Sequence, residues 1–268
     1  MSRTKKAVII GSVLVGIGVI IGFIGIAIGG FKFPNGAVDL TTMKALHTEK
    51  KTVQIADAFD KIEIAGASSM DIEICKSKTG KNYVEYYDTD DWTSHVDVKD
   101  HVLKFTTDDK GKHKAIVSLG FGKDTRTRIY LTDAEYKEIA VTTLSGYVTI
   151  QDVNAETVNV SASSGDLYMK NINVPDSIMA TSSSGDIDLE NATAKQIELG
   201  ANSGDIEMQD ITAESLRMST SSGDIDLESC DAEKFDITTS SGDVDMEITA
   251  GRTYRFETKT NSGAVDVA

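Results

Sequence analysis

Two series of acidic residues in the second half of the chain could bind cations, because rows of hard carboxylate oxygens suit ions such as Ca²⁺. The first series consists of Asp166, Asp186, Asp205, Asp224 and Asp243. The second series stands two residues further on and consists of Asp188, Glu207, Asp226, Asp245 and Asp266. The weak calcium candidates are the four consecutive pairs Asp186, Asp188, Asp205, Glu207, Asp224, Asp226, Asp243 and Asp245.

A structural role explains the same carboxylates without a metal ion. An Asp that follows a glycine in a turn commonly accepts backbone N–H groups. Alternate residues of a strand point to the same side, so both series should face solvent if Ile187 and Leu189 point inward. Rows that face solvent offer a cation few oxygens, whereas Ca²⁺ prefers about 6–8 ligands. We favour the structural interpretation and predict no metal site and no cofactor.

The repeated Ser-Ser-Gly triplets suggest serine nucleophiles, but the sequence lacks the partners that such catalysis requires. A serine nucleophile needs a base within hydrogen-bond reach. The four histidines all lie outside the repeats: His47, His95, His101 and His113. Lys78-Thr79-Gly80 matches one element of penicillin-binding enzymes, yet the only Ser-x-x-Lys runs from Ser2 to Lys5. We expect no catalytic residues, and serine hydroxyls that satisfy one another at a turn.

Charge separates the two halves of the chain and limits the partners it could have. Residues 141–268 contain 23 acidic and 7 basic residues, while the whole chain has a net charge of −15. Such a surface repels phosphate backbones, so we expect no nucleic-acid binding. Paired carboxylates leave an alternative open, namely an extracytoplasmic domain that binds carbohydrate or Ca²⁺ or, less readily, cleaves carbohydrate.

The two cysteines do not have the spacing of metal ligands. Cys230 aligns with Ala192 and Ile211 in neighbouring repeats and should therefore point into the core as a free thiol. A disulfide between Cys75 and Cys230 is the alternative, since such bonds form outside the cytosol.

A glycine that recurs at a nearly fixed spacing identifies the elements that carry these side chains. The spacings between successive members are 19, 20, 19, 19, 19 and 21 residues. The members are Gly146, Gly165, Gly185, Gly204, Gly223, Gly242 and Gly263. A fixed period in this range predicts a stack of structural repeats. We expect the glycines to form one column at a corner, which requires either a positive φ or a close backbone approach.

One repeat, residues 184–203, shows the pattern within a coil. Apolar residues alternate with polar ones around Ile187/Leu189 and again around Ile197/Leu199, as in strands with one buried face. A short turn, Asn-Ala-Thr-Ala, separates the two stretches. The period is too short for helical crossovers. The sequence therefore predicts an all-β fold, a parallel β-solenoid with about 19 residues per coil.

The region before the array is less regular. Residues 59–74 resemble a degenerate first coil, with Met70 in the place of the glycine. Alternating stretches such as NYVEYYD, SHVDVK, HVLKFTT, KAIVSL and RTRIYL predict irregular strands that cap the start of the solenoid. We assign residues 52–140 to this irregular β region and residues 141–268 to the regular repeats.

The N-terminal segment predicts a membrane anchor. Residues 7–31 contain no charged side chain, and at ~1.5 Å per residue a helix of this length spans a bilayer. Basic residues within 1–6 place this tail in the cytoplasm and the β domain outside the cell. Residues 32–51 would be a juxtamembrane linker. Gly18/Gly22 and Gly25/Gly29 have GxxxG spacing, which either allows a helix-mediated dimer or reflects the abundance of glycine in membrane helices.

The repeated SSGDIDL turns, the lead-in RIYLTDAEYKEIAVTTLSGYVTI and the N-terminal anchor together resemble a known bacterial family. This is the putative-adhesin β-strand-repeat family of LiaG-like membrane-anchored proteins, formerly a domain of unknown function, and the resemblance covers residues 50–268. It implies a non-enzymatic cell-surface protein linked to adhesion or to the envelope-stress response, as a scaffold or a sensor. The expected partner is an unidentified protein or polysaccharide of the cell envelope.

Overall fold

The computed structural model describes residues 37–39, 44–45, 48–67, 70–89, 92–110, 116–118, 126–248 and 254–268. The predicted membrane anchor, residues 7–31, lies outside them. No helix among the described residues has the length and apolar character needed to cross a membrane.

The chain forms two compact units. The smaller one contains a three-stranded antiparallel sheet of β1 (Ala37–Asp39), β2 (Lys44–Ala45) and β9 (Ile116–Ser118). The predicted strand in KAIVSL is present as β9, and its residues pair with β1 in this smaller sheet. The larger unit holds residues 48–112 and 125–268 and includes the solenoid.

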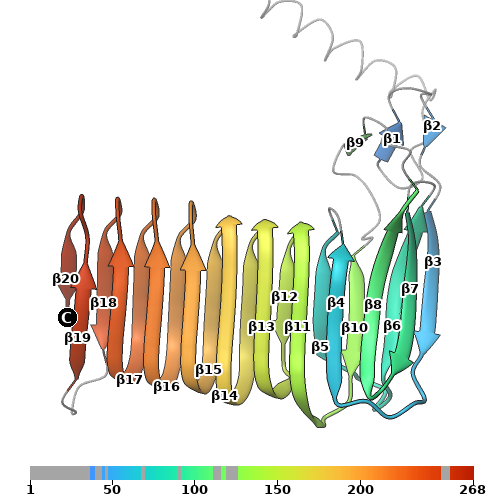
Figure 1. Cartoon of the computed structure of the whole chain (residues 1–268), viewed down its shortest axis with the longest axis horizontal. Helices are drawn as coiled ribbons and strands as arrows, with labels where there is room; N and C mark the ends of the chain where they lie inside the picture. The colour runs from blue at the N-terminus through green and yellow to red at the C-terminus, as the bar shows by residue number, and fades with distance from the viewer. Residues whose placement is uncertain are drawn as a thin grey trace, which may run out of the picture. The chain divides into compact units, whose positions relative to one another are not determined.

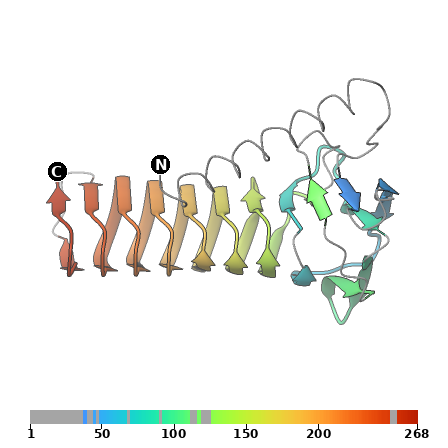
Figure 2. The ribbon, with the colours of Figure 1, turned by 90° about the horizontal axis from the view of Figure 1, so that it is seen from above.

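The regular coils are long strands that pair in parallel with the coils on either side (Figures 1 and 2). Four of them are β14 (Leu167–Ser184), β15 (Ile187–Ala201), β16 (Ile206–Thr220) and β17 (Ile225–Thr239). Each strand bends into a U (Figure 1). We call the part equivalent to residues 187–190 the first arm and the part equivalent to 196–201 the second arm. The stack has about seven turns of about 19 residues, as the sequence predicts.

The core lies between the arms and consists of the apolar columns that the alternation predicts. Ile187 pairs with Ile206, and Ile206 pairs with Ile225. All three side chains are fully buried, as are Ile197 and Leu216 of the second arm. Burying one side chain of this size contributes about 1.5–3 kcal/mol, and each added coil buries several apolar side chains.

The bend between the arms is made by a residue in the left-handed conformation, and not by the four-residue turn that we predicted at Asn-Ala-Thr-Ala. In β15 only Asn191 takes a positive φ, of 50°, and the strand continues beyond it. Asn and Asp tolerate this conformation better than other residues with a Cβ. The equivalent residues form a second column: Asp152 (56°), Asn171 (52°), Asn191 (50°), Asp210 (55°) and Ser229 (56°). The Asn171 amide donates to Asp152 Oδ1 at 2.9 Å, and the Asn191 amide donates to Asn171 Oδ1 at 2.8 Å.

The first regular levels contain β11 (Glu135–Ser145), β12 (Val148–Gln151) and β13 (Asn154–Ser164). The segment that resembles a degenerate coil contains β4 (Lys61–Ala67) and β5 (Ile72–Lys76), which pair in parallel with β11 and β12. Beyond β5 lies β10 (Thr127–Leu131), which leads into β11. The chain therefore leaves the stack after β5 and returns through β10.

The excursion contains β6 (Tyr83–Thr89), β7 (Trp92–Lys99) and β8 (Val102–Asp109). β3 (Thr48–Gln54) pairs antiparallel with β6, although it begins inside the predicted linker 32–51. β8 pairs antiparallel with β7 and parallel with β4, which joins the excursion to the second arms of the stack.

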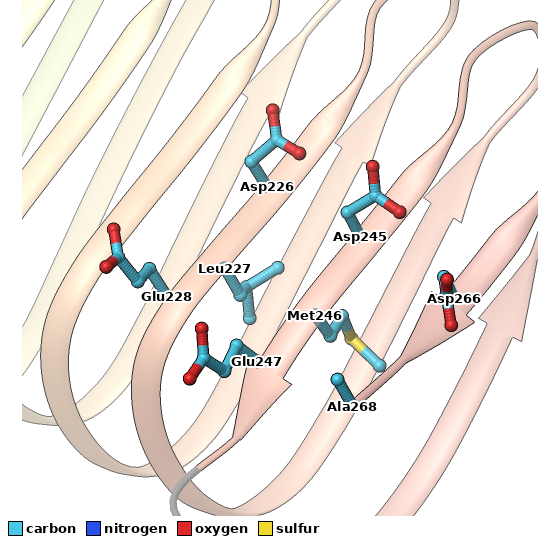
Figure 3. A pocket seen from close by; sticks show the side chains of 8 residues that line it. All are labelled: Asp226, Leu227, Glu228, Asp245, Met246, Glu247, Asp266 and Ala268. Carbon is cyan, nitrogen blue, oxygen red and sulfur yellow. The ribbon is translucent and has the colours of Figure 1, made fainter.

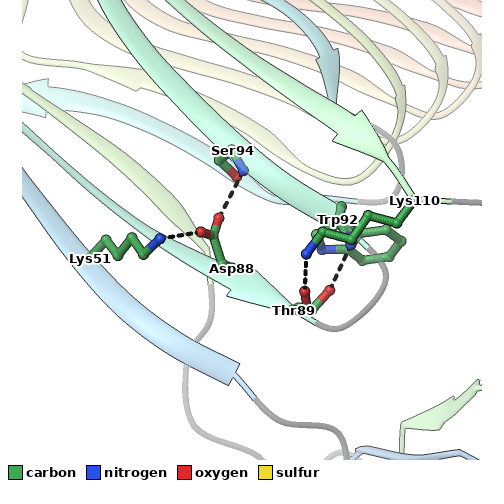
Figure 4. A network of polar contacts seen from close by, with 6 residues as sticks. All are labelled: Lys51, Asp88, Thr89, Trp92, Ser94 and Lys110. Carbon is green, nitrogen blue, oxygen red and sulfur yellow. Dashed lines mark hydrogen bonds and ion pairs between the residues drawn. The ribbon is translucent and has the colours of Figure 1, made fainter.

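A polar network ties β3, β6 and β7 together (Figure 4). The buried Asp88 carboxylate accepts hydrogen bonds from Lys51 Nζ at 2.5 Å and from the Ser94 N–H at 2.8 Å. Burial opposes ionisation, but these two donors outweigh it and hold the pKa of Asp88 below its usual value. Asp88 therefore acts as a charged clamp between three strands.

The stack ends with β18 (Val244–Ile248), β19 (Arg255–Lys259) and β20 (Val265–Val267). β18 and β20 continue the first arms, and β19 continues the second arms.

Candidate functional site: an acidic face on a glycine column

The recurring glycines stack in one column at the end of the arms opposite the left-handed bend. A Cβ added to Gly204 would lie 2.2 Å from the carbonyl oxygen of Gly185, and one added to Gly223 would lie 2.0 Å from that of Gly204. Gly146 stacks in the same way on Met70, with 2.3 Å to its carbonyl oxygen. Of the two reasons that we considered for glycine, the close approach of the backbone is the one that applies along the whole column.

The first acidic series holds this column together. In each coil one carboxylate oxygen accepts the backbone N–H of the residue that follows the next glycine, as in Asp186 Oδ1 with the Asp205 N–H at 2.9 Å. Asp205 accepts from the Asp224 N–H at 2.8 Å, and Asp243 accepts from the Ala264 N–H at 2.7 Å. A charged acceptor strengthens such a bond. The first series therefore has the structural role that the sequence indicates, although each bond reaches the next coil.

Hydroxyl groups at the inner side of the turns bond to the backbone. Thr220 Oγ1 donates to the Gly204 carbonyl at 3.1 Å, and Thr239 Oγ1 donates to the Gly223 carbonyl at 3.2 Å. Ser182 makes the same bond to Gly165 at 3.1 Å. These bonds come from the residue that precedes each Ser-Ser-Gly triplet, and mutual bonds among the triplet serines stay a prediction.

The second acidic series lies along the outer surface of the first arms. Asp188 pairs with Glu207 and Glu207 with Asp226, so the series forms a row one strand spacing apart. Burial and the charge of Glu207 raise the pKa of Asp188 to about 6. Burial and the charge of Asp245 raise the pKa of Asp226. The row is therefore a set of carboxylates that repel one another.

The structure contains a third acidic row that was not predicted from the sequence. It stands two residues beyond the second series and contains Glu190, Glu228 and Glu247. The signal was present in the repeated DIDLE and DVDME segments. Glu190 is paired with Lys170 and with the Tyr168 hydroxyl, which lowers the pKa of Glu190.

The second and third rows border a shallow hollow of about 300 Å³ near the C-terminal end of the stack (Figure 3). Asp226, Asp245 and Asp266 lie along one side, while Glu228 and Glu247 lie along the other. Leu227 and Met246 stand between the two rows in the chain, but their side chains are buried in the core. The hollow could receive a cationic or hydroxyl-rich group.

The calcium candidates are thus divided between two tasks. The four of the first series bond to turn N–H groups, whereas the four of the second series face outward. In the part of the chain that the structure describes, no three His, Cys, Asp or Glu side chains are arranged to hold a metal ion.

The residues considered for catalysis are scattered. His95 Nε2 lies 3.2 Å from Asp108 Oδ2 on the exposed surface of β7 and β8, and His101 stands in the turn between these strands. Lys78 and Thr79 form a turn after β5, and Ser77 Oγ lies 3.0 Å from Thr79 Oγ1. His47 and His113 lie outside the described residues.

The two cysteines are free thiols. Burial raises the pKa of Cys75 to about 11 and that of Cys230 to about 12. Cys230 is fully buried, as its alignment with Ala192 predicts. Five strand steps separate the level of Cys75 from that of Cys230. This is roughly 24 Å at ~4.8 Å per step, far beyond the reach of a disulfide.

A second hollow, of about 510 Å³, is lined by polar and charged side chains. Lys76, Ser77 and Lys78 lie on the side of β5, and Asp152 and Asn171 come from the left-handed column. Lys76 Nζ is paired with Asp133 Oδ2 at 2.8 Å. No pattern in the sequence indicated this hollow, because the excursion of the chain brings its lining together.

Comparisons with known proteins agree with this architecture. A family model described as Toastrack DUF4097 matches residues 59–268. No curated protein matches the chain. A crystal structure from Bacteroides fragilis, described as a putative adhesin, is 22% identical, covers 83% of this chain and 97% of its own, and gives a TM-score of 0.56. Another from Parabacteroides merdae, described in the same words, is 13% identical, with 82% and 96% coverage and a TM-score of 0.48. At 22% identity, the likeness to the first of these structures is one of fold.

Proposed function

The chain belongs to the Toastrack DUF4097 family, and from this premise we propose that it is a non-enzymatic module of the bacterial cell surface. It serves as an adhesin or as a scaffold or sensor of the envelope-stress response. Its acidic first arms are the surface that meets the partner. A solved protein of the same fold, described as a putative adhesin, supports this assignment, and so does the regular construction of the array.

The observation that carries the proposal is that the acidic rows differ in role: the fold uses the carboxylates of the first series but not those of the second. The first series is used by the fold, because its carboxylates bond to the turns. Asp226, Asp245 and Asp266 make no side-chain hydrogen bond or ion pair with any described residue. The array therefore presents an open row of carboxylates that the fold does not use, which suits a cationic or hydroxyl-rich polymer of the envelope better than a small substrate.

The membrane anchor is part of the proposal. Residues 7–31 hold the protein in the membrane with the N-terminus in the cytoplasm and the β domain outside. Protease added to intact protoplasts should then digest the β domain. Full protection of the β domain would contradict this orientation.

Cell-wall binding tests the acidic surface. The full chain in detergent is incubated with purified cell-wall material, and the bound fraction is compared with that of a triple variant, Asp226→Asn, Asp245→Asn and Asp266→Asn. A control variant with the same change in charge, Glu198→Gln, Glu214→Gln and Glu233→Gln, alters exposed acids elsewhere on the coils. We expect at least a fivefold loss for the first variant only. Equal binding by all three proteins would exclude this face as the adhesive surface.

A second candidate function, binding of a short saccharide, is favoured by the 510 Å³ hollow. Its volume lies in the range of small-molecule sites, about 300–1,000 Å³, and its lining offers ammonium, carboxylate, amide and hydroxyl groups. Titration of the protein with cell-wall oligosaccharides would detect it, and Lys78→Ala should abolish the heat of binding. Heat that persists in this variant would place the site elsewhere.

A further inference from the structure

The last level of the stack exposes side chains that every earlier level buries. Phe256 is 40% exposed, whereas Phe235, its partner one level below, is 0% exposed. Val265 and Val267 are 41% and 47% exposed, whereas Val244 and Met246 below them are 0% and 3% exposed. The final level therefore has the composition of an interior level but lacks a covering layer among the described residues.

The backbone of β20 also directs hydrogen-bonding groups away from the stack. The Ala264 carbonyl accepts from the Val244 N–H at 3.0 Å, and the Ala268 N–H donates to the Met246 carbonyl at 2.9 Å. Alternate residues of a strand in a parallel sheet bond to opposite neighbours, so Val265 and Val267 point their N–H and C=O groups outward. An edge with apolar side chains and free backbone groups is a template for another strand.

We propose that this edge pairs with the same edge of a second copy of the chain, so that two solenoids join end to end around a twofold axis. This inference is independent of the proposed function. In such an interface the same surface patch meets itself, and strands β19 of the two copies run antiparallel. The stack then continues from one copy into the other.

Charge complementarity selects the second copy as the occupant and also defines the register. When the axis passes through Phe256, Arg255 of each copy stands opposite Glu257 of the other. Both side chains are exposed on the outer surface of β19, so the twofold axis creates two ion pairs of opposite charges. Directly opposed residues of antiparallel strands have Cβ atoms about 4.5–5.5 Å apart, which is within reach of these side chains.

The same register extends an aromatic stack that is already present. The rings of Phe235 and Phe256 are stacked, with centroids 5.0 Å apart and an interplanar angle of 20°. Phe256 of the second copy would cover the outer side of this ring. The exposed area of Phe256 would then be buried in the way that Phe235 is buried by the level above it.

Cross-linking tests the register. The full chain in detergent carries Phe256→Cys, which places the new thiols of two copies opposite each other, or Glu198→Cys as a control on the outer surface of the second arms three levels below. The native Cys75 and Cys230 are buried and have raised pKa values, so they give little background. Under mild oxidation at about 0.15 M salt, where screening acts over ~8 Å, we expect at least fivefold more dimer from Phe256→Cys.

Charge reversal tests the ion pairs without a new cysteine. Sedimentation velocity of the otherwise unchanged full chain should show a dimer that Arg255→Glu or Glu257→Arg alone weakens at least tenfold. The double variant should recover the dimer, because it restores opposite charges. Three outcomes would each overturn the proposal. They are failure of this rescue, equal cross-linking at positions 198 and 256, and an edge that captures another protein while the chain remains monomeric.

Discussion

The regular array and the β region before it bury similar side chains, yet they are held together in different ways. In the array each contact recurs one coil later, such as the bonds of Asp186 and Asp205 to the following turns. In residues 48–110 each contact occurs once, such as the Lys51–Asp88 clamp or the edge-to-face pair of Tyr86 and Phe105. Repetition spreads stability over many equal contacts, whereas the irregular region depends on individual ones.

The largest loss of stability is expected in the glycine column, where the array has no room for an added Cβ. Gly223→Ala places a Cβ 2.0 Å from the Gly204 carbonyl oxygen and 2.6 Å from its carbon. Only a backbone shift could relieve this overlap, so we expect a loss of about 3 kcal/mol or more in the free energy of unfolding. Urea unfolding of the full chain measures it.

Gly200→Ala is the matched control for this change. Its Cβ would meet only side-chain atoms at 3.7 Å, and replacing glycine there also reduces the entropy of the unfolded chain. We expect stability within about 0.5 kcal/mol of the parent. Equal losses at the two positions would mean that the close approach does not explain the column.

The next effect concerns the irregular region. Asp88→Ala removes the acceptor of the Ser94 N–H and leaves Lys51 without its partner. An unsatisfied buried donor costs about 1–3 kcal/mol, so we expect a loss of about 2 kcal/mol near neutral pH. Asp108→Ala, at an exposed carboxylate beside His95 on neighbouring strands, should change stability by less than about 0.5 kcal/mol.

The pH dependence of this clamp follows from its lowered pKa. The folded protein binds the Asp88 proton more weakly than the unfolded chain does. The stabilisation is therefore present above the unfolded value of about 3.9 and disappears as the pH falls through the folded value. Urea titrations at several pH values should show the parent and Asp88→Ala converging below about pH 4. A constant difference would argue against a charged clamp.

A smaller effect should separate the two acidic series. Asp205→Ala removes a charged acceptor from the Asp224 N–H, and we expect a loss of about 1–2 kcal/mol. Glu207→Ala, two residues further on, removes a charge that only repels its neighbours, so stability should be unchanged or slightly higher. Thermal melts of the two variants measure the contrast. Similar losses would show that the second row also holds the fold together.

The smallest effect should be visible only as a function of pH. The pKa of Asp188 is raised to about 6, so its favourable contribution is complete below the unfolded value of about 3.9 and is lost as the pH rises through 6. Asp188→Asn should therefore be more stable than the parent by about 1 kcal/mol at pH 7.5 and equal to it at pH 4. A difference that does not change with pH would contradict the raised pKa.

The sequence predicted the array well because its constraints are local and repeat. The spacing of the glycines sets the coil length, and the alternation around Ile187 and Ile197 identifies the buried face. The Asp after each glycine indicated its bond to the turn, although the sequence could not show that the bond reaches the next coil. These features can be recognised in the sequence because each coil packs in the same way with nearly the same residues.

The left-handed column and the excursion could not be predicted in the same way. The bend is made by Asp, Asn or Ser, and these residues are also common where φ is negative, so the position does not stand out as a glycine does. β10 pairs with β5, more than 50 residues earlier, and nothing in the sequence of either strand indicates which strand it pairs with. Pairings between such distant strands depend on the packing of the whole region.

Coil-by-coil stacking has a consequence for the way such a chain can evolve. Removing a whole coil, for example residues 204–222, would bring Gly223 onto Gly185 and Asp224 onto Asp186 with the same contacts. Nearly identical segments such as SSGDIDL, which occurs twice, favour unequal recombination at this unit. Relatives should therefore differ in length by whole coils, and each coil gained or lost would move the far end of the domain by one strand spacing, about 4.8 Å.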